Sequence, residues 1–496
     1  MKKNVGKWLL LILLVTFVQC TNSKGTDEPV VEEVLLSASP LDLHFDYEGG
    51  EKVVSVKCSG KWDINIPAGS WCLPSIQSSK GDAVISLTAS GNDLLTDRVL
   101  EFTVSSSGAS PIVLKVKQDA NPDNSKADYI EEDKTGMSDD ALTLASKIKL
   151  GWNLGNSMEV PANLGGETGW NNPKTTKTFI DVVKAAGFNA VRIPCAWDSY
   201  IENRATYKVK DSWLARVKEV VDYCIDNDMY VILNIHWDGG WLENNPTMAK
   251  QGEVNREQQA LWKQIAINFR TYDEHLLFAG TNEVHVADVY SDPTTENNTA
   301  QQSYNQTFID AVRATGGRNR FRNLIVQTYN TNIAYGVKYM KMPIDVVQNR
   351  MMVEVHYYDP YDFALNGSSS IYYWGMDYKK YGLVGDWGQE GYLESTFALM
   401  KTNFVDKGYP VILGEFGAIR RSSLVNDVLG HHLESRAYYL ESVTATAKKY
   451  GMVPFYWDNG DIGNNGMGIF DRFANAVFDK QGMNALLQGS VVSYPY

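Results

Sequence analysis

The sequence predicts an α/β fold: a (β/α)8 TIM barrel preceded by a small antiparallel, Ig-like β-sandwich. Apolar runs of strand length alternate with amphipathic helical patterns after residue 137, and apolar residues recur at period two before residue 120. A third observation orients the barrel, because the apolar run 410–413 ends abruptly at Gly414-Glu415-Phe416-Gly417. A carboxylate at the carboxyl end of a barrel strand lies on the rim where active sites are built.

Length, charge and composition limit the possible functions. At 496 residues the chain is too long for one core, so we expect two domains, and we expect a monomer. The formal net charge of -13 argues against nucleic acid or an anionic membrane surface as a partner. The 13 Trp and 27 Tyr residues suit a neutral ligand bound by stacking, such as a sugar. No metal or cofactor motif is found, and Cys58, Cys72, Cys195 and Cys224 are predicted to be buried thiols.

Residues 1–20 have the pattern of a secretory signal. Three lysines precede the apolar run 8–18, which is too short to span a bilayer. Cys20 closes the segment and resembles the lipidation site of bacterial lipoproteins, although Gln19 departs from the usual small residue. The prediction is an exported lipoprotein at the outer membrane or cell surface, attached through the polar tether 21–33. If Cys20 is not lipidated, ordinary cleavage would leave a secreted or periplasmic protein.

Residues 34–120 alternate between apolar and polar positions, with turn clusters such as 48–50 and 106–108 between the runs. Short strands at this spacing predict a small antiparallel sandwich. Trp62 and Trp71-Cys72 in the middle, Arg98 at the start of a late strand and Gln118 at the end of the last resemble a BACON domain. That resemblance implies either glycan binding or a spacer that holds the next domain off the membrane.

Residues 121–136 are polar and unpatterned and are predicted to be a linker, after which Ser138-Asp139-Asp140 predicts a helix cap. Helical patterns such as 178–186 and 213–226 then separate eight predicted strands. These strands are 148–153, 190–194, 230–235, 276–280, 324–328, 352–355, 411–414 and 453–456. The pattern predicts a (β/α)8 barrel over residues 137–496. A doubly wound sheet is the alternative, but no glycine-rich phosphate fingerprint follows any strand.

Nearly every predicted barrel strand ends in a residue that can bind a ligand or transfer a proton. In chain order these residues are Asn153, Asn156, Arg192, His236, Asn282, Glu283, His356, Tyr358, Glu415, Trp457 and Asp458. Each alone has an ordinary structural explanation, such as a surface cation or a core histidine. Because seven strand ends converge on one barrel mouth, the joint pattern predicts an active site there.

The motifs around these residues resemble glycoside hydrolase family 5. They occur in the family's order as VRIP at 191–194, IH at 235–236, NE at 282–283, HYY at 356–358, GEFG at 414–417 and WDNG at 457–460. The sequence at 168–177, 236–244, 305–317 and 356–363 resembles subfamily 4 of that family, which consists mainly of endo-β-1,4-glucanases and xyloglucanases. The resemblance covers roughly residues 137–496.

The family resemblance implies a role for each matching residue. Glu283 would be the acid/base, Glu415 the nucleophile, and Asn282 would hold the 2-hydroxyl of the sugar at the cleavage point. The remaining substrate-binding residues would be Asn156, Arg192, His236, Trp237, His356, Tyr358 and Trp457. Two positions depart from the family, because Val284 replaces the usual proline and Trp237 the usual second histidine.

Retaining hydrolysis of a glycosidic bond requires one carboxylate that attacks and one carboxylic acid that protonates the leaving oxygen. We therefore expect Arg192 and Tyr358 to favour the charged form of Glu415, and the charge of Glu415 to keep Glu283 protonated. Aromatic residues in loops that follow strands are candidate sugar platforms. They are Trp170, Trp237, Trp241, Tyr329, Tyr361 and Trp374.

The sequence therefore predicts a retaining endo-glycosidase that cleaves β-1,4-glucan backbones, with xyloglucan ahead of mixed-linkage glucan and cellulose derivatives. A mannanase or xylanase of the same family is the enzymatic alternative. The alternative outside enzymes is a surface glycan-binding protein with an inactive barrel. The presence of both Glu283 and Glu415 argues against that last alternative.

Overall fold

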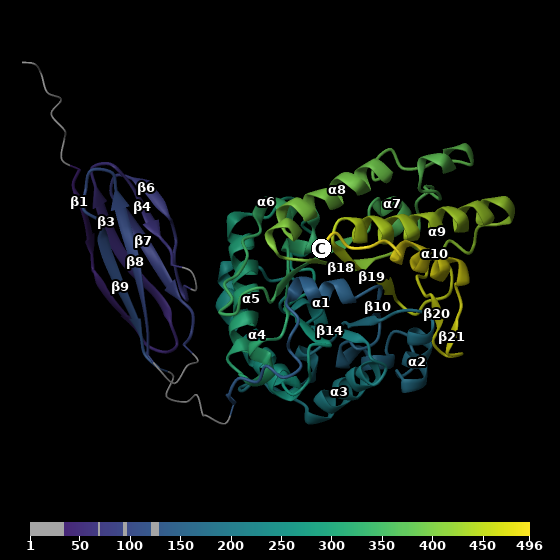
Figure 1. The fold of residues 1–496 in the computed structure, drawn as a ribbon, viewed down its shortest axis with the longest axis horizontal. Coiled ribbons are helices and arrows are strands. Elements are labelled where there is room, and N and C mark those ends of the chain that lie inside the picture. The colour runs from purple at the N-terminus through teal and green to yellow at the C-terminus, as the bar shows by residue number, and fades with distance from the viewer. Residues whose placement is uncertain (1–33, 68–69, 93–96, 121–127) are drawn as a thin grey trace, which may run out of the picture.

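The computed structural model describes residues 34–67, 70–92, 97–120 and 128–496 (Figure 1). The predicted signal segment, Cys20 and the tether 21–33 lie outside the described residues, as does the first half of the predicted linker. Within the described ranges, no helix is both long and apolar enough to cross a membrane. Cys58, Cys72, Cys195 and Cys224 are buried free thiols, as predicted.

The N-terminal part consists of two sheets that share one apolar core, which includes Trp62, Phe102 and Leu114. The first sheet has the order β1 (Leu36–Ser39), β3 (Gly50–Cys58), β7 (Ala83–Ala89) and β5 (Cys72–Pro74). The second has the order β2 (Asp42–Phe45), β9 (Ile112–Gln118), β8 (Arg98–Ser106), β4 (Lys61–Asn65) and β6 (Ser78–Lys80). The predicted sandwich is confirmed, except that β2 and β9 pair in parallel.

Arg98 and Gln118, which the sequence singled out, close one end of the sandwich. They pair directly in the β8–β9 register, and Arg98 Nε donates to Gln118 Oε1 at 2.9 Å. The buried Gln118 amide donates in turn to the carbonyl oxygens of Asp46 at 3.0 Å and Ser90 at 2.9 Å. The Arg98 guanidinium also lies 4.5 Å from the ring centre of Trp71, a cation–π contact.

The second part is a closed barrel of eight parallel strands, in chain order around the ring. The strands are β10 (Gly151–Leu154), β11 (Ala190–Ile193), β14 (Tyr230–Asn234), β15 (Leu276–Ala279), β16 (Leu324–Gln327), β17 (Met351–Tyr357), β18 (Val411–Phe416) and β19 (Met452–Asp458). All eight predicted strands are present, so the prediction of a TIM barrel is confirmed. Two short strand pairs lie outside it: β12 (Ile201–Asn203) with β13 (Lys208–Val209), and β20 (Phe470–Asp471) with β21 (Ala476–Val477).

Helices surround the barrel (Figure 1). They are α1 (Ala141–Lys147), α2 (Lys177–Ala185), α3 (Asp211–Ile225), α4 (Met248–Phe269), α5 (Thr295–Arg313), α6 (Ile333–Tyr339), α7 (Tyr361–Ala364), α8 (Glu390–Asn403), α9 (Asn426–Lys449) and α10 (Lys480–Ser490). Short 3-10 turns occur at Ala162–Leu164, Gly166–Thr168, Asp198–Tyr200, Asp238–Gly240, Gly317–Arg320, Tyr329–Thr331, Met376–Lys380 and Val405–Lys407. The Asp140 side chain caps α1 by accepting from the Thr143 main-chain N–H at 2.8 Å, within the predicted cap.

The end of the stretch predicted as a linker contacts the barrel. Ile130 forms an isolated bridge with Gly316, and Asp133 pairs with Arg318 at 3.2 Å.

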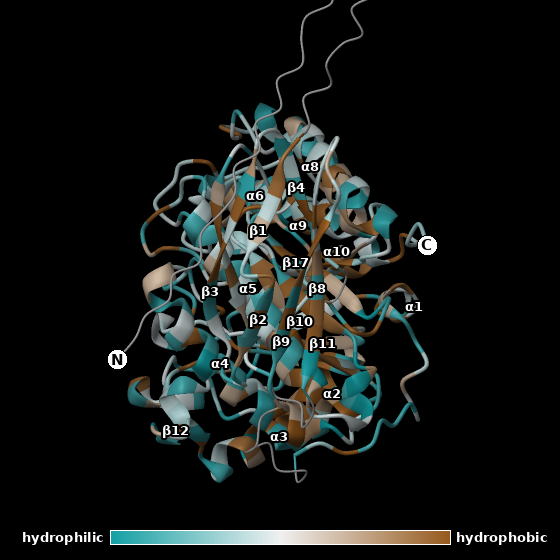
Figure 2. Cartoon of the chain, turned by 90° about the vertical axis from the view of Figure 1, so that its left-hand side faces the viewer, coloured by the Kyte–Doolittle hydropathy of each residue, from teal (hydrophilic) through white to brown (hydrophobic). Residues whose placement is uncertain are grey.

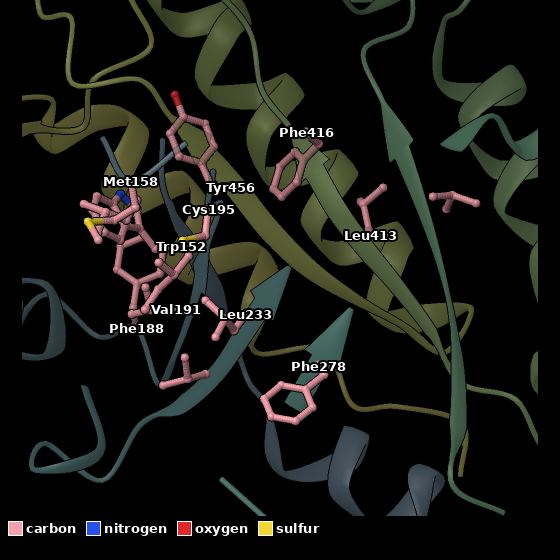
Figure 3. Packing of buried hydrophobic residues seen from close by; sticks show 14 of the residues in the cluster. Trp152, Met158, Phe188, Val191, Cys195, Leu233, Phe278, Leu413, Phe416 and Tyr456 are labelled. Carbon is pink, nitrogen blue, oxygen red and sulfur yellow. The ribbon is translucent and has the colours of Figure 1, made fainter. Parts of the chain in front are cut away.

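Alternating strand positions build two apolar clusters. Val191, Leu233 and Phe278 belong to the large cluster between strands and helices, part of which Figure 3 shows together with Trp152, Leu413 and Tyr456. The intervening positions, such as Ile232 and Ile412, form a second cluster with residues of α1. Figure 2 shows hydrophobic colour along parts of the strands and hydrophilic colour on many outer helices and loops.

Polar residues replace apolar ones at the same alternating positions further along the strands. Arg192, Gln327 and Glu354 come two residues after Ala190, Ile325 and Met352 of the α1-side cluster, and all three are fully buried. The strand register then shifts at Val355–His356 and again between Leu413 and Phe416, as in a β-bulge. A bulge re-aims the side chains that follow it, here those of the rim.

Candidate active site

Glu415 lies at the end of β18 in a buried, hydrogen-bonded position, 6% exposed. Arg192 Nη1 donates to its Oε1 at 2.9 Å, and the Tyr358 hydroxyl donates to its Oε2 at 3.0 Å. Gly414 is required before it, because a Cβ there would lie 2.1 Å from Glu354 Oε1. The predicted placement of Glu415 between Arg192 and Tyr358 is therefore observed.

Glu283 follows β15 and approaches Glu415 across the barrel mouth. Its Oε1 lies 2.7 Å from His356 Nδ1 and 3.5 Å from the Thr331 hydroxyl, and its side chain is 35% exposed. One carboxylate oxygen of Glu283, one of Glu415 and a ring nitrogen of His356 all lie within 4.8 Å of one another. The two glutamates, distant in sequence, thus form one close pair, with Glu415 buried and Glu283 partly exposed.

His356 lies between three carboxylates. Its Nδ1 lies 2.7 Å from Glu283 and 3.7 Å from Glu415, and its Nε2 lies 3.3 Å from Glu354 Oε1. Burial alone would lower its pKa, but the charge of Glu415 and the hydrogen bonds to Glu283 and Glu354 outweigh burial and raise the pKa to about 10. The ring is therefore an imidazolium near neutral pH, with both N–H groups directed at carboxylates.

The pKa values of the two glutamates shift in opposite directions. Burial disfavours the charge of Glu283, but the hydrogen bond and charge of His356 outweigh burial and lower its pKa. Burial raises the pKa of Glu415, and the charges of His356 and Arg192 offset only part of that rise. The sequence led us to expect that Glu415 keeps Glu283 protonated, but the His356 ring, 2.7 Å from Glu283, favours its charged form instead.

Arg192 organises the floor of the site. Besides Glu415, its guanidinium binds Asn153 Oδ1 at 3.0 Å, Asn282 Oδ1 at 2.9 Å and Glu354 Oε1 at 2.9 Å. Glu354 was missed by sequence reasoning. The available signal was a lone charge inside the apolar stretch 351–358, since a buried charge requires a partner.

Glu243 is a second residue that sequence reasoning missed. Its Oε2 accepts hydrogen bonds from Asn282 Nδ2 at 3.0 Å and from the main-chain N–H of Glu283 at 3.2 Å. It is 6% exposed, and burial together with the charge of Glu283 raises its pKa to about 8. It lies in a loop without periodic pattern, and the available signal was its position within the stretch 236–244 that resembles subfamily 4.

The other predicted binding residues lie around this network. His236 stacks on Trp457 with ring centres 6.0 Å apart and planes 9° apart, and burial, with the charge of Arg192, lowers its pKa well below the usual value. Trp237 and Trp170 lie 6.4 Å apart between ring centres. Asn156 contacts a neighbouring loop, because its carbonyl accepts from Asn172 Nδ2 at 2.8 Å.

Two predicted sugar platforms are core residues instead. Trp374 is fully buried against Tyr439, and its Nε1 donates to the Gly388 carbonyl at 2.7 Å. Tyr329 is 3% exposed, and its hydroxyl accepts from the Val286 N–H at 3.1 Å. Both rings are covered by neighbouring loops and helices, whereas the other four candidates remain at least partly accessible.

Val284, one of the two departures from the family pattern, is buried and anchors the loop that carries Glu283. It packs in a small apolar cluster with Leu242, Val254 and Tyr304. Its carbonyl accepts from the Asn330 N–H at 2.9 Å. The valine therefore holds this loop by packing rather than by the restricted backbone of a proline.

Glu283, His356 and Glu415 each place one possible ligand atom within 4.8 Å of the others. Carboxylates and an imidazole are ligand types that a small metal site would use. Two observations favour proton chemistry over metal binding here. The Arg192 guanidinium already binds Glu415, and the raised pKa of His356 keeps the ring protonated, whereas a metal ligand must be neutral.

The charge of His356 predicts a pH-dependent stability. Its folded-state pKa is raised from 6.5 to about 10, so its contribution is fully present below pH 6.5 and is lost as the pH rises through about 10. We expect His356→Gln to destabilise the protein by a few kcal/mol near pH 6, and the difference from the wild type to shrink toward pH 10. Denaturant unfolding at several pH values measures this.

His432 provides the matched control. It is a buried neutral ring that accepts from the Arg421 N–H at 3.1 Å, and burial lowers its pKa to about 4. His432→Gln should therefore show a constant destabilisation between about pH 8 and 10, where its ring is neutral in both the folded and the unfolded protein, whereas the effect of His356→Gln should shrink over the same range. An equally constant difference for His356→Gln would contradict the assignment of a charged ring.

A pair of close carboxylates at the mouth of a (β/α)8 barrel is the arrangement found in glycoside hydrolases. The chain belongs to the cellulase family, glycosyl hydrolase family 5, whose model matches residues 155–463. The resemblance to that family expected from the strand-end motifs is thereby confirmed.

Relatives of known activity match over long stretches. A xyloglucan-specific endo-β-1,4-glucanase of Bacteroides ovatus is 39% identical over 97% of this chain and 96% of its own. A solved B. ovatus family 5 xyloglucanase in complex with a XXXG heptasaccharide is 39% identical, covers 92% of this chain and 100% of that chain, and gives a TM-score of 0.71. A broad-specificity GH5-4 endoglucanase from Ruminococcus champanellensis with bound cellotriose is 35% identical over 70% of this chain and 98% of its own, with a TM-score of 0.63.

Proposed function

We propose that this protein is a retaining endo-β-1,4-glucanase of subfamily 4 that prefers xyloglucan to mixed-linkage glucan and cellulose derivatives as its substrate. The observation that carries the proposal is the carboxylate oxygens of Glu283 and Glu415 within 4.8 Å of each other. Retaining enzymes place their carboxyl groups about 5 to 5.5 Å apart, whereas inverting enzymes need about 6.5 to 9.5 Å to admit a water. The similarity to xyloglucanases supports the substrate.

In this mechanism Glu415 attacks the anomeric carbon while Glu283 protonates the leaving oxygen. Arg192 and Tyr358 donate to Glu415 and orient it for attack. For this step Glu283 carries a proton, gives it to the leaving oxygen as the glycosidic bond breaks, and is left as a carboxylate whose Oε1 lies 2.7 Å from His356 Nδ1. The lowered pKa of Glu283 suits its second role, in which the carboxylate activates the water that hydrolyses the glycosyl-enzyme.

The remaining residues bind the sugar. Asn282 would hold the 2-hydroxyl at the cleavage point, and the stacked rings of His236 and Trp457 would form the floor of that subsite. Trp170 and Trp237 offer aromatic faces beyond it, and such faces stack on sugar rings. Several aromatic contacts in succession would hold an internal stretch of the polysaccharide, which favours cleavage within chains.

Side-by-side assays on xyloglucan, carboxymethylcellulose, mixed-linkage glucan, mannan and xylan test this function. We expect xyloglucan to be cleaved fastest, with a rapid fall in viscosity and few new reducing ends. Heat-inactivated protein is the control. Negligible turnover of xyloglucan beside strong mannan or xylan hydrolysis would refute the proposed substrate. Mono- or disaccharides as the earliest products would refute cleavage within chains. Binding without turnover would favour a glycan-binding protein.

We further propose that the N-terminal sandwich is a BACON-like domain that holds the enzyme away from a bacterial surface or contacts glycan. The B. ovatus relative, which matches 97% of this chain, supports a shared two-part architecture. Lipidation at Cys20 would place a monomeric enzyme at the outer membrane, with the lipid as its membrane contact.

A further inference from the structure

Glu243 links two loops of the site. It follows β14, whereas the groups that it binds follow β15. Its Oε2 accepts from the Asn282 side chain at 3.0 Å and the Glu283 main chain at 3.2 Å, and its carbonyl accepts from the His285 N–H at 2.9 Å. Three positions of the loop that carries the acid/base therefore depend on one residue.

The Asn282 amide is held at both ends. Its Oδ1 accepts from Arg192 Nη2 at 2.9 Å, while its Nδ2 donates to Glu243. Rotating the amide by half a turn would set its N–H groups against the Arg192 donors and its oxygen against Glu243. The two contacts together fix the orientation of this amide, and an amide nitrogen has a second hydrogen for a ligand.

We propose that Glu243 is a positioning residue for the hydrolysis, which fixes the Asn282 amide and the main chain of Glu283 relative to the sugar. This inference rests on the function proposed above. Glu243 acts through those two residues and not by transferring a proton to the substrate. A single oxygen, Oε2, accepts both hydrogen bonds, so a neutral acid or an amide can do the same.

The test compares Glu243→Ala with Glu243→Gln on soluble β-glucan. The alanine variant lacks the acceptor, so we expect kcat to fall about 10²-fold through misplacement of Asn282 and Glu283, with little change in KM. The glutamine variant keeps an acceptor oxygen at the same reach and should restore most of kcat. A residue needed only for folding would change the amount of folded enzyme, not the kcat of the folded fraction.

Glu257→Ala is the matched control, because Glu257 is also a buried glutamate but pairs with Arg204, at 3.4 Å. It should keep wild-type kcat even if its thermal midpoint falls. If Glu243→Ala does not fold, Glu243→Asp replaces it, since aspartate is one methylene too short and should be impaired where Glu243→Gln is not.

Three results would overturn the inference: wild-type kcat in the alanine variant, a glutamine variant as impaired as the alanine variant, or an aspartate variant as active as the glutamine variant. If the wild type is active and any of these results is found, the role of Glu243 is overturned while the proposed function stands. A wild-type protein that cleaves no glycan overturns the proposed function and this inference with it.

Discussion

Glu415→Ala should lose activity on every substrate, polysaccharide and activated aryl glycoside alike, on the order of 10⁵-fold or more. The variant lacks the group that forms the covalent intermediate, and a good leaving group cannot replace an attacking carboxylate. Arg192 keeps its contacts with Glu354 and Asn153, so the fold around the vacated position is retained. Initial rates with polymer and with a dinitrophenyl cello-oligoside measure the loss.

Glu415→Gln is the control for folding. The amide has the shape of the carboxylate and keeps an oxygen for Arg192, but it is a poor nucleophile. It should be as inactive as the alanine variant and unfold at a temperature near that of the wild type.

Azide added to Glu415→Ala should enter from the vacated side and give an α-glycosyl azide, because only one displacement then occurs. Wild-type-like turnover of the aryl glycoside by either variant would contradict the role of Glu415.

The barrel and the pair of glutamates could be predicted because both produce patterns that are local in the sequence. Each strand is an apolar run, and each run ends in a polar group at the rim. Only the extents of the strands differ, since β17 and β18 continue to Tyr357 and Phe416, through the bulge that turns the catalytic side chains.

The contacts that set the protonation of the site could not be predicted, because they depend on the register around the closed barrel. Glu354 meets Arg192 only when the barrel closes, and Glu243 reaches Asn282 only through the fold of its loop. The burial of Trp374 likewise depends on packing against α9. An aromatic residue in a loop has the same sequence signature whether it faces sugar or core.

Glu283→Ala should separate the two steps of the reaction. Loss of proton assistance should lower polymer hydrolysis about 10² to 10⁴-fold. An aryl glycoside with a good leaving group needs no such proton, so it should still form the intermediate rapidly and release its aryl group in a burst. The intermediate should then accumulate, because Glu283 is also the base that activates water.

Azide should speed the breakdown of that intermediate and give a β-glycosyl azide, since attack on the glycosyl-enzyme restores the original configuration. The opposite azide anomers from Glu283→Ala and Glu415→Ala would distinguish the two carboxylates, which lie within 4.8 Å of each other. Glu243→Gln is the matched control: it alters a neighbouring glutamate but leaves the acid/base, so it should show no burst and no azide effect. If Glu283→Ala is as inactive as Glu415→Ala on the aryl substrate, or if its azide product is α, the two roles are assigned wrongly.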